Sequence, residues 1–443
     1  MKAEARVWLG PAAAMLALGL APGANALPTF AAQTGAPCAA CHVGGFGPQL
    51  TPFGREFKLH GYAMRSNGFT APVSIMAVAS YVRTAKDQPA PPAPHYSVND
   101  NFTLDQASVF IAGGVGHFGA FIQTTYDGVA RAFHWDNADL RAVTSATIGG
   151  KNVVAGLSLN NAPTVQDAFN TLPAWGFFYT SSALAPAPGA APLIGAFAQN
   201  TVGLTAYTWI DSQLYLEAGG YVSPSAGFLT HFGVDPTSPG DIDGVAPYGR
   251  IAFDKNWGDH NLEVGAFAMH ANIFPGHDMS TGLTDRYTDV GVDASFQHFG
   301  TGKNVFTVNS RYIYEQQQLD ASQALGLSGA RRTHLQDIRL DASYYWRSKI
   351  GASVAVFDTW GPPDQLLFAG NRTFKPASSG VMFQIDGTPF GNSDSPLGRR
   401  FNARVGLQFT HYLSFDGAGK NYDGFGRNAA DNDTVRVFTW VAY

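Results

Sequence analysis

Short segments in which polar and apolar residues alternate recur from about residue 73 to the end of the chain, and they constrain its fold most. The clearest are Asp289–His298, Phe401–Thr410, Gln213–Tyr221 and Asp337–Ala342. A two-residue period places the two sets of side chains on opposite faces of a β-sheet. These segments therefore predict strands with one polar and one apolar face.

The connections between these segments alternate in length. The tight turns are Gly149–Lys151, Asp211–Ser212, Trp257–Asp259, Gly300–Gly302 and Arg347–Ser348. The long loops are 161–192, 222–245, 271–286, 317–332, 360–379 and 413–432. Short turns at one end and long loops at the other are typical of outer-membrane barrels. A soluble β-sandwich or propeller also has many short strands, but it needs no such asymmetry.

The fold class predicted for residues 73–443 is an all-β transmembrane barrel of about sixteen antiparallel strands. The first strand is expected near Ser74–Lys86 and the last at Thr434–Tyr443, which ends on an aromatic residue and resembles the C-terminal insertion signal of bacterial outer-membrane proteins. A barrel of this size is wide enough for an aqueous channel, with lipid around its outer face.

Composition excludes two other classes of protein. The mean hydropathy of −0.06 is too low for a bundle of membrane-spanning helices. The formal net charge is −5, and the chain has no block of basic residues, which argues against nucleic-acid binding.

Residues 1–26 are expected to be an export signal. Lys2 and Arg6 precede a mostly apolar run, Val7–Leu20, and Ala24-Asn25-Ala26 is a small-residue cleavage site. An uncleaved membrane anchor is the alternative, but the apolar run is shorter than the roughly 20 residues that a span needs. The mature chain is therefore expected outside the cytoplasm.

The two cysteines of the chain lie together in Cys38-Ala39-Ala40-Cys41-His42. This C-x-x-C-H pattern is the attachment signature of c-type haem. The two thiols would form thioether bonds to the haem, and His42 would be the proximal ligand of its iron. The sequence thus predicts one covalently attached haem c in residues 27–72.

The cysteine pair is open to three other interpretations. A plain disulfide is open to exported cysteines. A zinc site normally needs four ligands, one more than this motif supplies. A thioredoxin-like redox pair needs a surrounding βαβ pattern, which the sequence lacks.

The second axial ligand of the haem iron has three candidates close in sequence. They are Met76, Met64 and His60, and the alternative is a five-coordinate iron. Methionine would raise the reduction potential relative to a second histidine. Because residues 27–72 are too few to build a core unaided, this haem segment is expected to lie in or against the barrel lumen.

The stretch around the motif, with Leu50-Thr51-Pro52-Phe53-Gly54-Arg55-Glu56-Phe57-Lys58-Leu59-His60-Gly61-Tyr62, resembles the fused monohaem cytochrome–porins of bacterial outer membranes, whose best-known members oxidise iron(II). The resemblance covers the whole architecture, but at the level of motifs only about 30 residues. It implies Cys38 and Cys41 as attachment sites and His42 as ligand. It also implies electron transfer from an extracellular donor, Fe(II), through the haem to a periplasmic carrier such as a soluble cytochrome, an iron(II):cytochrome c oxidoreductase activity.

Two further functions stay open at this point. One is a passive diffusion porin whose N-terminal plug carries a haem for structural reasons. The other is the same conduit run outward, to an external acceptor. Loop carboxylates suit hard cations, but Asp235, Asp241, Asp243, Asp278 and Asp285 show no metal-ligand spacing and are expected to solvate the loops.

Overall fold

The computed structural model describes residues 28–64, 73–173, 178–392, 395–397 and 401–443. The predicted export signal, residues 1–26, lies outside the described residues. None of the described helices is long and apolar enough to cross a membrane.

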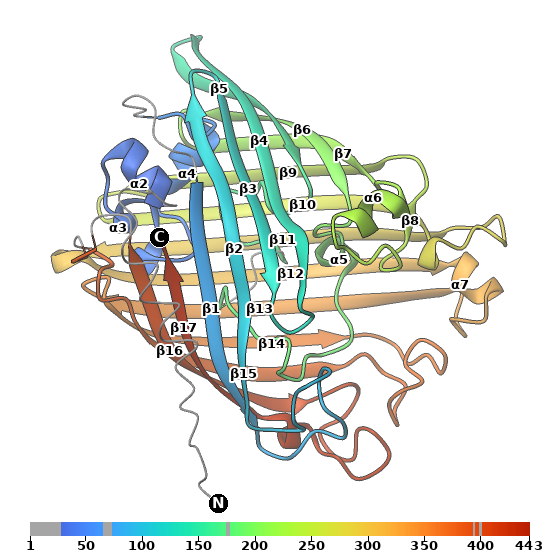
Figure 1. Ribbon diagram of the computed structural model, residues 1–443. Helices are drawn as coiled ribbons and strands as arrows, with labels where there is room; N and C mark the ends of the chain where they lie inside the picture. The colour runs from blue at the N-terminus through green and yellow to red at the C-terminus, as the bar shows by residue number, and fades with distance from the viewer. Residues whose placement is uncertain (1–27, 65–72, 174–177, 393–394, 398–400) are drawn as a thin grey trace, which may run out of the picture.

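The described strands form one antiparallel sheet that closes on itself, because β17 pairs with β1 and β1 pairs with β2 (Figure 1). The strands are β1 Val73–Thr84, β2 Asn101–Val115, β3 Phe118–Asp127, β4 Ala132–Ile148, β5 Lys151–Asn160, β6 Val202–Ile210, β7 Leu214–Val222, β8 Asp241–Ile242, β9 Ala246–Trp257, β10 His260–Phe274, β11 Asp285–Gly300, β12 Asn304–Leu319, β13 Arg332–Trp346, β14 Ile350–Trp360, β15 Ser378–Gly387, β16 Asn402–Ser414 and β17 Thr434–Ala442. The two-residue β8 only caps the end of β10. The other sixteen strands make a closed barrel, as the sequence predicts.

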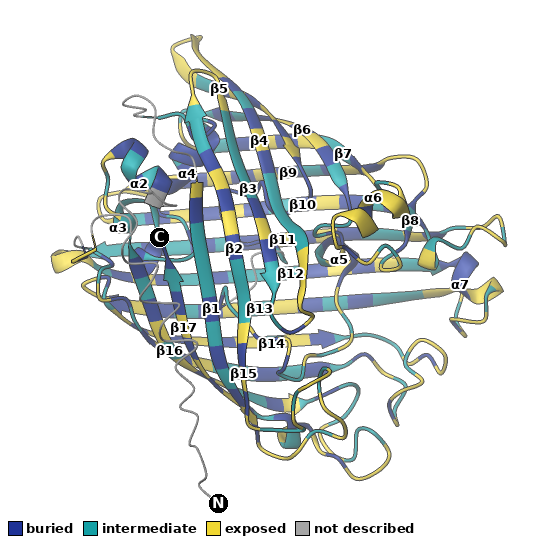
Figure 2. Ribbon diagram, viewed as in Figure 1, coloured by how far each residue is buried: buried dark blue, intermediate teal, exposed yellow. Residues whose placement is uncertain are grey.

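Burial alternates along the strands (Figure 2). On β11, Asp289 and Asp293 are buried inside the barrel, whereas Val290 and Val292 are half exposed on its outer face. The same alternation holds on β16, where Arg404 is buried and Leu407 is exposed. A closed barrel with an apolar outer face leaves no sheet edge in lipid, so this protein is an outer-membrane β-barrel.

The connections fall into two sets at opposite ends of the barrel. At the turn side, residues 116–117, 149–150, 211–213, 258–259, 301–303 and 347–349 join strands. The long connections 85–100, 161–201, 223–245, 275–284, 320–331, 361–377 and 415–433 start and end at the loop side. Outer-membrane barrels have short periplasmic turns and longer extracellular loops, so the turn side faces the periplasm.

Two connections depart from that rule. The β3–β4 connection at the loop side spans only residues 128–131, and the β15–β16 connection at the turn side spans 388–401. Strands also extend into segments predicted as loops, since β10 continues to Phe274 and β12 to Leu319. The short loop-side helices are α6 Ala226–His231, η4 Pro275–His277, α7 Asp320–Ala324 and η6 Ala429–Asn432, and η5 Thr301–Lys303 forms a turn-side connection.

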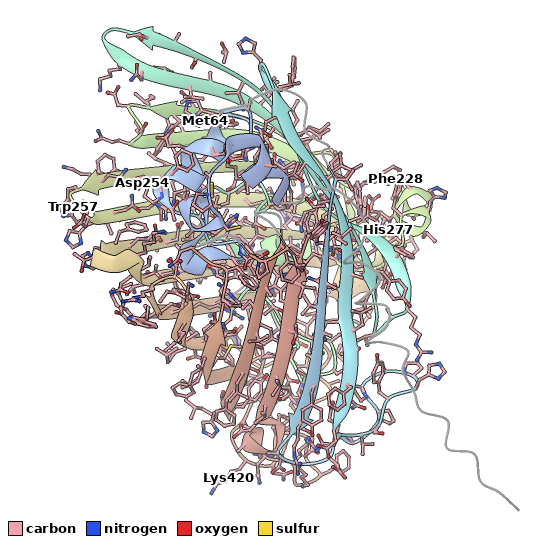
Figure 3. The ribbon with its side chains drawn as sticks, turned by 60° about the vertical axis from the view of Figure 1, so that its left-hand side comes forward. Met64, Phe228, Asp254, Trp257, His277 and Lys420 are labelled. Carbon is pink, nitrogen blue, oxygen red and sulfur yellow. The ribbon has the colours of Figure 1, made fainter. Side chains whose placement is uncertain are left out.

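The N-terminal segment, here called the plug (residues 28–64), is a cluster of short helices at the turn side (Figure 1). The helices are α2 Pro28–Thr34, α3 Cys38–Cys41, η2 Val43–Gly45 and α4 Pro52–Leu59. Thr51 caps α4 by accepting a hydrogen bond of 3.2 Å from Gly54 N, and Pro52 occupies its first turn. In Figure 3, Met64 and Asp254 lie at this end of the barrel, and Phe228 and His277 at the opposite end.

Candidate functional site

Cys38 and Cys41 begin and end the single turn of α3, and His42 follows as its C-terminal cap. His42 leaves the helix in extended conformation and forms a β-bridge with Leu50. Thr51 then closes the loop, because its N–H donates to Cys41 O at 2.9 Å and its hydroxyl to Ala40 O at 2.6 Å. The three motif residues are thus held on one tight loop.

The helix α4 packs against this loop without space for a side chain at Gly54. A Cβ at that position would lie 2.2 Å from Cys41 O, far inside van der Waals contact. Only glycine permits this approach. The local sequence Phe53-Gly54 therefore fixes how closely the second helix of the plug lies to the cysteines.

A cavity of about 320 Å³ opens beside the motif, between the plug and the barrel wall. Cys38, Cys41 and His42 all line it. Its apolar lining includes the plug residues Phe30, Phe46, Leu50 and Phe57, and the barrel residues Met76, Phe110, Phe121 and Trp440. Such aromatic and aliphatic walls suit a flat apolar macrocycle, so the residues present can hold a haem.

His42 lies in this cavity with the chemistry of a metal ligand. Burial lowers its pKa to about 4, so the ring is neutral at neutral pH. Its Nδ1 is buried and has no hydrogen-bond partner of good geometry among the described residues, although the nearby Gly47 backbone acts to raise the pKa. A neutral imidazole is the form that binds iron.

The three candidates for a second axial ligand lie in different places. Met76 points into the barrel from β1 and lines the cavity, where it packs beside Phe46, Phe438 and Trp440. Met64 is not among the described residues of the cavity lining. His60 lines another hollow with Trp209, and its Nδ1 lies 2.8 Å from Glu56 O. Only Met76 shares the cavity with His42.

The long connection between β5 and β6, here called the strap (residues 161–173 and 178–201), folds into the lumen and borders the cavity. Its Asn170 and Tyr179 contribute to the lining. Asn170 Oδ1 accepts a hydrogen bond of 2.9 Å from Leu50 N of the plug. Lys58 Nζ donates to the strap carbonyls of Val165 and Asp167 at 2.6 and 3.1 Å. The helix α5 (Leu193–Ala196) belongs to the strap, and its Leu193 and Ile194 pack in a hydrophobic cluster with inward side chains of the barrel wall.

Buried polar contacts fix the plug to the barrel wall. Arg55 Nη1 lies 3.3 Å from Asp254 Oδ2 and donates to Asn261 Oδ1 at 2.7 Å. On the other side, Tyr62 OH donates to Asp139 Oδ2 at 2.6 Å. Near the cysteines, Asn402 Nδ2 donates to Gly45 O at 2.9 Å. The plug is therefore part of the lumen core rather than an appended domain.

The loop carboxylates do not form a metal site among the residues that the structure describes, where no group of three or more His, Cys, Asp or Glu side chains is placed to hold an ion. Asp235 is exposed and bonds Thr237 of its own loop. The expectation that Asp285 lies in an outer loop is wrong. It begins β11, is fully buried and accepts a hydrogen bond of 2.9 Å from Ser322 N.

Apart from Met76, the sequence did not identify the residues of the cavity lining that the barrel and the strap supply. Phe110, Phe121 and Trp440 come from β2, β3 and β17, and only their inward strand positions could have marked them. The strap gives no such signal, because its Pro- and Gly-rich sequence reads as an outer loop.

Comparisons with known proteins give the fold alone. No protein-family model matches the chain, and no curated protein matches it. Solved porin structures are similar at low identity. The anion-selective porin of Comamonas acidovorans is 12% identical with a TM-score of 0.46, covering 84% of this chain and 98% of its own. Salmonella typhi OmpF, solved with daunomycin, is 12% identical with a TM-score of 0.45, covering 84% and 97%. Pseudomonas aeruginosa OccK2 is 10% identical with a TM-score of 0.40, also covering 84% and 97%.

Proposed function

We propose that this protein transfers electrons across the outer membrane through one c-type haem, from an extracellular donor, Fe(II), to a soluble periplasmic carrier. The observation that carries the proposal is the position of Cys38, Cys41 and His42 on the wall of one apolar cavity at the turn side. Cys38 and Cys41 would attach the haem, and His42 and Met76 would bind its iron. When bound, the haem supplies a centre that accepts and releases one electron.

The residues around the cavity support this role in three ways. The plug and the barrel wall each supply part of the lining, so the site is complete only when the plug is docked. Apolar side chains such as Phe110 and Trp440 form most of its surface. The burial of His42 keeps its ring neutral and able to bind a metal.

The position of the cavity sets how the two redox partners reach it. The apolar belt of such a barrel is about 25 Å tall, so one cofactor at the turn side does not touch both surfaces. A soluble carrier can approach the plug directly from the periplasm. Fe(II), as a small cation, must then travel from the loop side through the lumen. Each Fe(II) gives up one electron and becomes Fe(III), and the carrier gains that electron.

A passive diffusion porin with a structural plug is the second candidate, and the porin-like barrel favours it. The plug and the strap are then structural elements that narrow the lumen. Proteoliposome swelling with neutral sugars measures this activity directly. If the protein is a passive porin, removal of residues 28–64 should increase the swelling rate, and neither protein should transfer electrons.

The proposal is tested with purified protein in detergent or nanodiscs. Intact mass should show one covalently bound haem, and reduced-minus-oxidised spectra should show a c-type haem. Stopped-flow mixing with Fe(II) should reduce it, and a soluble cytochrome should reoxidise it. The matched control is Cys38→Ser/Cys41→Ser, which should retain the barrel and lose the haem. A wild-type protein without haem, or a haem that Fe(II) does not reduce at any pH, contradicts the proposal. Reoxidation only by external acceptors would indicate the outward direction.

A further inference from the structure

The turn-side face carries an uneven distribution of charge. Among the described residues of the short connections, three positive side chains gather on two of them: Lys303 on the β11–β12 connection, and Arg347 and Lys349 on the β13–β14 connection. We call these three residues the basic patch. Lys303 and Arg347 are exposed, and Lys349 is half buried.

Hydrogen bonds hold the basic patch together as one surface. Lys303 Nζ donates to Asn392 O at 3.3 Å, and Asn392 in turn donates to Arg347 O. Ser348 Oγ donates to Lys303 O at 3.1 Å. The segment that follows β15 therefore joins two separate turns. Residues 393–394 and 398–400 of that segment lie outside the described residues. The basic patch does not include them and consists of Lys303, Arg347 and Lys349 alone.

The basic patch adjoins the haem motif through close backbone contacts. A Cβ on Gly45 would lie 2.4 Å from Gly391 Cα, and one on Gly391 would lie 2.0 Å from Ser348 O. A Cβ on Gly44 would meet the ring of Tyr345 at 2.5 Å. Gly44 and Gly45 follow His42 almost directly in the chain. The patch is thus joined to the motif through the backbone contacts of Gly391 and Ser348.

The charge of the basic patch is not neutralised within the part of the chain that the structure describes. None of its three side chains forms an ion pair with another described residue. Elsewhere on the rim the situation differs, because Lys151 pairs with Asp211 at 3.5 Å. Exposed, unneutralised charge of one sign attracts partners of the opposite sign and speeds their encounter.

We propose that the basic patch is the docking surface for an acidic soluble electron carrier. This inference rests on the proposed function and names the partner class for the same site. A carrier seated on Lys303, Arg347 and Lys349 would lie against the loop that holds His42. Arg347 also lies over the ring of Trp346 at 4.8 Å. Because tryptophan is common at the membrane–water interface, phospholipid head groups are the competing partner, and the test must distinguish them from a soluble carrier.

The test measures electron transfer from haem-loaded protein in nanodiscs to two soluble monohaem cytochromes of similar potential, one acidic and one basic. With wild-type protein, the second-order rate constant for the acidic cytochrome should fall as ionic strength rises. In K303E/R347E/K349E it should drop by about tenfold or more at low salt, and the basic cytochrome should become the better acceptor. The matched control, R332E/K375E/K420E, makes the same change of charge at the loop side and should leave the rate unchanged.

Two outcomes overturn the inference. One is a rate that neither salt nor charge reversal changes. The other is an unchanged rate together with lower thermal stability of K303E/R347E/K349E in anionic-lipid discs, which would assign the patch to lipid head groups. Binding of the acidic cytochrome to Cys38→Ser/Cys41→Ser protein keeps the two proposals apart. That binding should persist without haem and disappear on charge reversal, whereas a wild-type protein without haem contradicts only the proposed function.

Discussion

Arg55 of the plug and Asp254 of β9 form an ion pair of 3.3 Å in which both side chains are almost completely buried. The guanidinium also donates to Asn261 Oδ1 and Ser295 Oγ, at 2.7 and 3.2 Å. A short N-terminal segment is thereby joined to the turn-side part of the barrel wall by a charge that water does not reach. The pair places α4, and with it the loop of the two cysteines.

Removal of the Arg55 charge should release the plug. In Arg55→Met, Asp254 stays buried without its ion-pair partner, which costs about 3–5 kcal/mol. Protease digestion followed by mass spectrometry should show residues 28–64 cleaved in this variant and protected in the wild type. Arg331→Met, which removes an exposed arginine at the loop side, is the control and should protect the plug fully. Equal protection in Arg55→Met would show that the ion pair does not hold the plug.

Substitution of Gly54 should disturb the cysteine loop. The Cβ of Gly54→Ala would lie 2.2 Å from Cys41 O, and backbone atoms on both sides leave no flexible group to move away. Overpacking of this kind costs about 1–3 kcal/mol. We expect a lower yield of covalently attached haem per barrel, measured by intact mass. Gly227→Ala, where a Cβ meets nothing within 4 Å, should match the wild type. Full haem loading of Gly54→Ala would contradict the packing described here.

Substitution of Met76 should lower the reduction potential of the haem-loaded protein. Met76 alone of the three candidate ligands lines the cavity, and a methionine ligand raises the potential. Redox titration should therefore show a lower potential and an altered spectrum for Met76→Ala. Met64→Ala and His60→Ala should titrate like the wild type. A changed reduction potential in His60→Ala alone would instead identify His60 as the second ligand and would contradict the role of Met76.

Acid should loosen two of the outer loops together. Burial acts to raise the pKa of Asp364, but backbone N–H donors outweigh it and hold this pKa well below the ordinary 3.8. The donors are Gly329, Ala330, Leu366 and Leu367, at 2.8 to 3.1 Å. The carboxylate of Asp364 binds a proton more readily when the loops are unfolded. Its contribution to the stability of the folded loops is therefore complete above about pH 4 and is lost as the pH falls.

Hydrogen exchange of residues 325–331 and 361–377, measured as a function of pH, checks this expectation. Asp364→Asn should show at neutral pH the fast exchange that the wild type shows only in acid. Asp278→Asn, which changes a half-buried carboxylate of another outer loop, is the control and should exchange like the wild type. Exchange of the two loops that is independent of Asp364 would contradict the assigned role.

The sequence was informative where a period or a spacing encodes geometry. The alternation in Asp289–His298 predicts the correct faces of β11, and the turn at Arg347–Ser348 separates β13 from β14 as expected. It was uninformative where distant segments meet. Nothing local shows that Asn170 of a long connection folds inward to bond Leu50, or that Asp285 is buried by Ser322. The first contact joins residues 120 positions apart, and the second joins residues 37 apart, so neither follows from the local sequence.

The most direct test of the central claim is the intact mass and the reduced-minus-oxidised spectrum of the purified protein, measured beside Cys38→Ser/Cys41→Ser. We predict one covalently bound haem in the wild type, reduced by Fe(II), and none in the variant. A wild-type protein of unmodified mass, or equal haem in both proteins, would contradict it.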